Sequence, residues 1–242
     1  MRESGRSLTV LALVVVSVAF AFSLSGAGRR VTAPPDGAEV AGARFRLRAA
    51  DARRAGAPVL PAADRAATFR FAPGTAASDR AAFLAAVADA RPPARTLIGL
   101  VDGLVDVRVG PTGRAGALGL TRSGGPRYDV TVDLGQVAAV YGRRGIDRVV
   151  LHELGHVIDH ALVPDAMMAG LQAGIPAGYG CEEGIAGACA IAPERFAESF
   201  AKWATGDIGV DLYVGYKVPP PAPTLDAWGA PLARLASDAT AR

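Results

Sequence analysis

Aromatic residues and histidine are scarce in this chain of 242 residues. Phe, Trp and Tyr together make up 6% of it while half of all residues are hydrophobic, so the core has to be built from Ala, Val and Leu. The three histidines, His152, His156 and His160, all lie within nine residues. Such a grouping of a scarce residue type makes this stretch the first candidate for chemistry.

A large charge of one sign is also lacking. The net charge is +3, which is too small to indicate a nucleic-acid partner. The sequence contains no phosphate-binding loop, recognition helix or RNA-binding motif. Arg outnumbers Lys 24 to 2, and Ala, Gly and Pro are abundant, so a single Arg or Pro carries little information.

One long hydrophobic run is present, from Leu8 to Leu24, and it follows Arg2 and Arg6. It spans 17 residues, whereas a membrane-spanning helix needs about 20. We predict that residues 1–27 form a signal peptide, cleaved after Ala27, or an N-terminal membrane anchor. Both alternatives predict a secreted or extracytoplasmic protein, and the second adds membrane association through this segment.

Three further regions follow along the chain. Residues 28–76 are rich in Arg, Ala and Pro and are predicted to be a linker or a loosely ordered arm, residues 77–217 the folded domain, and residues 218–242 a Pro-rich strap and tail. The patterns in the domain predict a helix at 79–90 ended by Pro92 and Pro93, strands at 97–101, 104–109, 117–121 and 128–134, and a short helix at 136–141. Asp102-Gly103 is typical of a hairpin turn. The expected class is α+β, with a small mixed or antiparallel-rich sheet before two long helices.

The stretch His152-Glu153-Leu154-Gly155-His156 has the spacing H-E-x-x-H. On a helix, residues four apart lie about 6 Å apart along the axis and on nearly the same face. Two imidazoles placed in this way can bind one Zn²⁺ ion. Glu153 can then accept a proton from a water that the ion has made acidic, so we predict it to be the catalytic base.

The surrounding residues predict the helix that this motif needs. Apolar residues recur at helical spacing, Asp147 is a plausible start after the breaker Gly145, and Pro164 ends the helix. The buried face is predicted to consist of Val150, Leu154, Val157, Ile158 and Ala161.

A zinc site needs a third protein ligand. His160 is excluded because it lies about 12 Å from His152 along a straight helix. The best source is a second predicted helix, from Pro193 to Gly206, on which Glu194 and Glu198 are one turn apart. We favour Glu198 as the ligand, with Glu194 as a partner in the outer shell or as its substitute. Glu182 and Glu183, in a Gly-rich loop, are weaker candidates.

Asp159 and the two cysteines each have more than one predicted role. Asp159 can accept the N–H group of a zinc-bound imidazole, or it can be an ordinary solvated helix residue. Cys181 and Cys189 predict a disulfide that closes a small loop in an exported protein, with a reduced pair or a thiolate zinc ligand as alternatives.

Residues 152–159, followed some forty residues later by residues 194–201 (E-R-F-A-E-S-F-A), resemble the zincin catalytic domain shared by anthrax lethal factor and the Pro-Pro endopeptidases. The resemblance implies a zincin-like fold, His152, His156 and Glu198 as zinc ligands, Glu153 as base, and peptide-bond hydrolysis. In that family a Tyr shortly before the second helix helps to stabilise the oxyanion. Here that position lies within residues 189–192, which contain no Tyr, so the oxyanion partner is Tyr179, Tyr213, Tyr216 or none of them.

The function expected from the sequence is therefore that of an exported zinc-dependent endopeptidase with one catalytic Zn²⁺ and a protein or peptide substrate. Two alternatives remain open. One is an extracytoplasmic zinc-containing binding or structural module with little catalysis, and the other is an amide hydrolase that acts on peptidoglycan.

Overall fold

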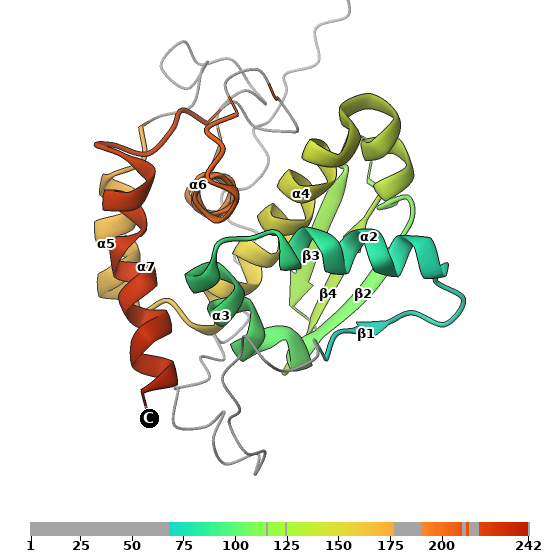
Figure 1. The fold of residues 1–242 in the computed structure, drawn as a ribbon, viewed down its shortest axis with the longest axis horizontal. Helices are drawn as coiled ribbons and strands as arrows, with labels where there is room; N and C mark the ends of the chain where they lie inside the picture. Colours follow the sequence, from blue (N-terminus) through green and yellow to red (C-terminus); the bar gives the residue numbers. More distant parts are fainter. Residues whose placement is uncertain are drawn as a thin grey trace, which may run out of the picture. The chain divides into compact units, whose positions relative to one another are not determined.

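The computed structural model describes residues 68–114, 116–123, 125–176, 190–209, 212 and 218–241. Within these residues the fold is a mixture of six α-helices and a small mixed sheet of four strands (Figure 1). The α+β class is therefore confirmed. Among the described residues, no helix is both long and apolar enough to span a membrane. The predicted signal or anchor, residues 1–27, lies outside this range.

The sheet has the order β1-β2-β4-β3. β2 pairs in parallel with both β1 and β4, and β3 pairs antiparallel with β4. Of the two expected alternatives, the mixed sheet is confirmed and the antiparallel-rich sheet is wrong, because two of the three pairings are parallel. The strands are β1 (Arg70–Phe71), β2 (Val105–Val109), β3 (Gly119–Ser123) and β4 (Tyr128–Val132). β1 begins the sheet inside the stretch that we expected to be a linker.

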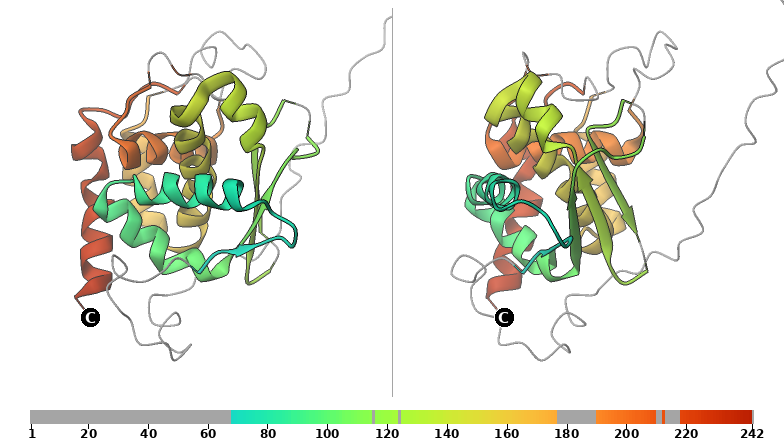
Figure 2. Two further views of the ribbon diagram at one scale, coloured as in Figure 1. Left: turned by 45° about the vertical axis from the view of Figure 1, so that its right-hand side comes forward. Right: turned by 90° about the vertical axis from the view of Figure 1, so that its right-hand side faces the viewer.

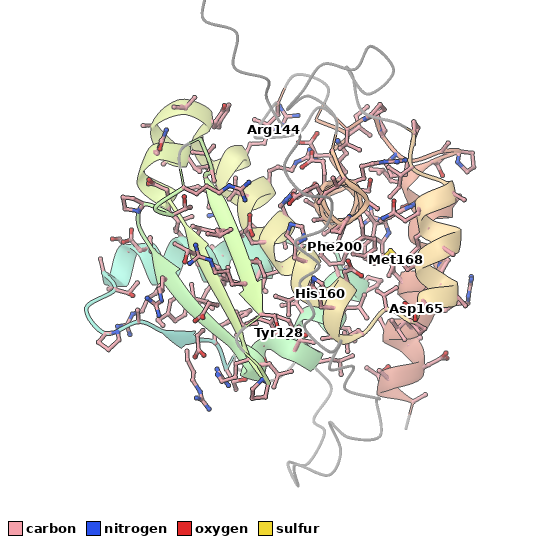
Figure 3. The ribbon with its side chains drawn as sticks, turned by 180° about the vertical axis from the view of Figure 1, so that it is seen from behind. Tyr128, Arg144, His160, Asp165, Met168 and Phe200 are labelled. Atoms are coloured by element: carbon pink, nitrogen blue, oxygen red, sulfur yellow. The ribbon has the colours of Figure 1, made fainter. Side chains whose placement is uncertain are left out.

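The two faces of the sheet differ in burial. On one face Val105, Val107, Val130 and Val132 are fully or almost fully buried, while the residues between them are partly exposed. α2 (Ala77–Ala88) and α4 (Leu134–Ala161) cover the buried face, and Figure 3, seen from behind, shows the strands in front of these helices. The alternation expected for a half-exposed strand at β4 is thus confirmed.

α3 (Pro92–Val101) is a helix where the sequence predicted a strand at 97–101. The two prolines begin this helix instead of ending the previous one, since the first helical turn tolerates a missing N–H group. Its buried residues are Ala94, Leu97, Ile98 and Val101, which have helical spacing. The predicted hairpin turn at Asp102-Gly103 is likewise a 3-10 turn, Asp102–Leu104, that leads into β2.

α4 combines the predicted short helix with the predicted metal-binding helix. The break between them is at Gly142, with φ 62° and ψ −158°, and not at Gly145 as expected. Gly145 is instead buried inside the helix, where a Cβ atom would come within 2.3 Å of the Tyr141 Cβ atom. The second part of α4 runs on to Ala161.

α6 (Ala192–Thr205) packs directly against α4, as the views in Figure 2 show. The approach is close at Gly155, where an added Cβ atom would lie 3.0 Å from the Ala197 Cα atom. Gly206 ends α6 with a left-handed conformation (φ 71°), as its sequence predicted. A glycine facing an alanine therefore lets the two helices that carry the predicted site come together.

Two further helices complete the described fold. α5 (Asp165–Ala173) was not predicted, because its residues were taken as part of a long connection. α7 (Leu225–Thr240) lies within residues 218–242, which were predicted to be a Pro-rich strap and tail. Its Trp228 donates a hydrogen bond from Nε1 to the Leu171 carbonyl at 3.0 Å. α5 and α7 stand beside α6, at the end of the molecule away from β1 (Figure 1).

Candidate metal centre

The two histidines of the H-E-x-x-H motif lie side by side on one face of α4. Their ring centroids are 5.0 Å apart, and each side chain is 12% exposed. Because the helix is continuous from Arg143 to Ala161, the spacing of four residues fixes this arrangement locally. The geometry predicted for His152 and His156 is therefore present.

Glu194, in the first turn of α6, completes a group of three potential ligands. Its Oε2 atom is 3.0 Å from His152 Nε2 and 3.3 Å from His156 Nε2. The three ligand atoms all lie within 4.8 Å of one another, so this group can hold a metal ion. Two imidazoles and one carboxylate form a donor set that catalytic zinc sites use.

Glu198 occupies a different place from the one expected. Its Oε2 atom faces the other ring nitrogen of His152, Nδ1, at 3.3 Å. Its Oε1 atom accepts hydrogen bonds from Arg148 Nη1 at 3.1 Å and from Lys202 Nζ at 3.0 Å. Glu194 therefore faces both imidazoles, whereas Glu198 lies behind one of them.

The cations around Glu198 are themselves buried. The side chains of Arg148, Glu198 and Lys202 are 1%, 5% and 4% exposed. Arg148 also donates to the Asp207 carbonyl, and Lys202 to the Val218 carbonyl. Buried charges need partners of this kind, since an unpaired one would be very costly. The result is a fixed carboxylate that can accept the N–H group of His152 at Nδ1.

These contacts decide which groups are charged when no metal is bound. Burial alone would lower the pKa of His152, but hydrogen bonds to Glu194 and Glu198 and the nearby negative charges raise it to about 10. Burial would raise the pKa of Glu194 and of Glu198, yet hydrogen bonds and charges from their cationic partners hold both below the usual value. A positive charge is therefore favoured between the two carboxylates.

Glu153, the predicted base, lies between α4 and the sheet. It is 5% exposed. Its Oε2 atom accepts a hydrogen bond from Thr121 Oγ1 on β3 at 2.7 Å. Its Oε1 atom lies 2.2 Å from the position that a Cβ atom would take at Gly119. The carboxyl group thus lies against the edge strand of the sheet.

Asp159 and His160 lie further along α4. His160 is exposed and stacks on Tyr128 of β4, with ring centroids 6.5 Å apart (Figure 3), and it is outside the metal-binding group. Burial, and then the charge of Asp159, raises the pKa of Tyr128. The partner of His152 at Nδ1 is Glu198 and not Asp159. A contact of Asp159 with His156 stays a prediction.

Several predicted residues lie outside the described part of the chain. They are Cys181 and Cys189 of the predicted disulfide, the weaker ligand candidates Glu182 and Glu183, and the oxyanion candidates Tyr179, Tyr213 and Tyr216. Their assignments stay predictions.

The sequence analysis missed four residues that contact the site: Gly119, Thr121, Arg148 and Lys202. Helical spacing offered a signal for two of them. Arg148 precedes His152 by four residues, and Lys202 follows Glu198 by four, which places each one turn away on the same face. Gly119 and Thr121 lie in a strand that was predicted two residues too early.

Comparisons with known proteins found no match for this chain. No family model matches the chain, no curated protein is similar to it, and no solved structure resembles it.

Proposed function

We propose that this chain is a zinc-dependent endopeptidase. The proposal rests chiefly on the convergence of His152 Nε2, His156 Nε2 and Glu194 Oε2. The Glu153 carboxylate is held against β3 and interacts electrostatically with His152. Three protein ligands leave a position for water or substrate, as in catalytic zinc sites. The resemblance of residues 152–159 and 194–201 to the lethal factor family supports the same activity.

The donor set fits Zn²⁺ better than a hard cation, since Mg²⁺ and Ca²⁺ prefer ligand sets of oxygen atoms. Glu194 takes the part of third ligand in this proposal. Glu198 accepts a hydrogen bond from the Nδ1 proton of His152, which would leave the Nε2 lone pair available to a metal ion. Zn²⁺ bound here would act as a Lewis acid that polarises the peptide carbonyl and makes water acidic near neutral pH.

The chain's own residues then carry the protons. Glu153 accepts one proton from the attacking water while the water oxygen adds to the peptide carbonyl carbon. The C–N bond then breaks, and Glu153 returns that proton to the departing amine. The carboxylate is restored, and one water molecule has been consumed for each bond cut.

β3 offers a place for an extended peptide. The Asp133 N–H group donates to the Leu118 carbonyl at 2.9 Å. Hydrogen-bonded pairs alternate in an antiparallel ladder, so the backbone groups of Gly119, Thr121 and Ser123 point away from β4. A substrate strand can add to this edge, next to Glu153.

The decisive experiment compares the wild-type chain with Glu153→Gln. We expect both proteins to bind one zinc per chain by elemental analysis, and only the wild type to cleave casein or a peptide library. Zinc binding with hydrolysis of peptidoglycan fragments alone would favour an amide hydrolase of the cell wall. Equal cleavage by the variant would refute Glu153 as the base.

A further inference from the structure

The inner face of β3 departs from the pattern of the sheet. Each residue of the strand has a partner on β4 and, beyond it, on β2. One row across the sheet joins Val107, Val130 and Thr121, and the next joins Val109, Val132 and Gly119. A row of buried and partly buried valines would be expected to continue with an apolar side chain. On β3 the first row ends instead with the hydroxyl group of Thr121, and the second ends with Gly119, which has no side chain.

Glu153 contacts β3 at both of these positions, whereas the third row, which joins Val105, Tyr128 and Ser123, ends with an exposed serine. At Gly119, a Cβ atom would lie 2.2 Å from Glu153 Oε1 and 2.7 Å from its Cγ and Cδ atoms. A Cβ atom essentially never approaches another non-bonded heavy atom within 3.0 Å, so any larger residue would push the carboxyl group away. Gly119 therefore provides the space in which the Glu153 side chain lies.

Thr121 supplies the other half of the contact. Its Oγ1 atom lies 2.7 Å from Glu153 Oε2 and 3.1 Å from the Glu153 carbonyl oxygen. A threonine hydroxyl has one proton to donate, and the shorter distance assigns it to the carboxylate. A hydrogen bond to a charged acceptor is stronger than one to a neutral carbonyl.

We propose that Thr121 and Gly119 are positioning residues for the general base. The Thr121 hydroxyl holds Glu153 Oε2, and the missing side chain at Gly119 admits Oε1, so β3 fixes the orientation of the carboxylate. This inference rests on the proposed function, since it takes Glu153 as the base. The strand that would pair with a peptide substrate would then also position the carboxylate that accepts the proton of the attacking water.

The kinetic test replaces Thr121 with valine, which has nearly the same shape but no hydroxyl group. We expect kcat to fall about tenfold, the scale of one lost hydrogen bond to a charged group, while KM changes less than about twofold. Zinc content should stay at one per chain. Thr121→Ser keeps the hydroxyl and should recover most of kcat. The matched control is Thr131→Val on β4, a residue whose neighbour across the ladder is Leu120, and it should leave kcat unchanged.

A second test needs no activity and no metal. In protein treated with a chelator, Tm is measured for Thr121→Val, Glu153→Ala and the double variant. If the hydroxyl binds the carboxylate, the double variant should lose less than the sum of the two single losses. Gly119→Ala should lower Tm markedly in the wild type but little in Glu153→Ala, because the smaller side chain leaves room for the methyl group.

The two tests separate this inference from the proposed function. Additive losses of Tm would overturn the Thr121 contact whether or not the chain cleaves peptides. An active wild type in which Thr121→Val keeps its full kcat would overturn the positioning role alone. A wild type that binds zinc and cleaves no peptide would overturn the proposed function, while the Tm cycle would still decide the contact.

Discussion

Two turns of α6 carry the same residue type toward the same histidine with different results. Glu194, in the first turn, is 24% exposed and faces the Nε2 atoms of both His152 and His156. Glu198, in the buried middle, is 5% exposed and faces Nδ1 of His152. The difference lies behind the carboxylates, because Arg148 and Lys202 hold the second oxygen of Glu198.

This comparison shows how a charged neighbourhood assigns roles to chemically identical groups. A carboxylate that two buried cations already hold is well suited to fix a histidine's tautomer. A carboxylate near the solvent, without such cations, can direct its oxygen at an ion. The role of each glutamate therefore depends less on its position along the helix than on the groups that contact its second carboxylate oxygen.

The largest effect is expected from replacing each of the two glutamates in turn with alanine. Glu194→Ala should reduce zinc affinity by more than about a hundredfold, because it removes a ligand, and the protein should lose its metal on dialysis. Glu198→Ala should retain zinc with affinity lowered about 10- to 100-fold, as for an outer-shell partner. Zinc content and competition with a chromophoric chelator measure both. The reverse order would make Glu198 the ligand and Glu194 the outer partner.

The next effect concerns the cations that distinguish Glu198. Lys202→Met should lower the free energy of unfolding by about 3 kcal/mol, since it leaves a buried carboxylate with fewer partners. Urea denaturation of the metal-free protein measures this loss. A matched control is Arg143→Met, whose side chain is 47% exposed although it pairs with Asp89 and Asp147. That loss should stay below about 1 kcal/mol, and similar losses at both sites would contradict the assignment of Lys202.

The smallest effect is a dependence of metal binding on pH. In the metal-free protein the pKa of His152 is raised to about 10, so at pH 7 the imidazole carries a proton that a metal must displace. Zinc binding should therefore release about one proton from His152, and affinity should weaken about tenfold for each pH unit below pH 9. Calorimetry in buffers of different ionisation enthalpy measures the proton. In Glu198→Gln the pKa of His152 should fall, so the pH dependence should level off at a lower pH than in the wild type.

Local sequence patterns predicted the two helices of the candidate site more accurately than they predicted the sheet. The apolar spacing around His152 depends on neighbours within one helix, and it predicted the second part of α4 apart from its start. The boundaries at Pro193 and Gly206 are equally local, and they predicted α6. The run Leu97–Val101 was assigned to a strand because a short apolar run fits either structure. Its burial among α2, α4 and α7, which settles the matter, is a tertiary property.

The sequence by itself determined that His152, Glu153 and His156 lie together, because one continuous helix spaces them. It also pointed to a carboxylate as the third candidate ligand, chiefly Glu194 or Glu198 on the second helix, with a Cys thiolate as a weaker alternative. The choice between those two was left to the tertiary structure, since it depends on how α4 and α6 meet at Gly155 and Ala197. The contact of Glu153 with β3 was decided in the same way, because residues 32 positions apart meet only once the sheet and the helix have packed.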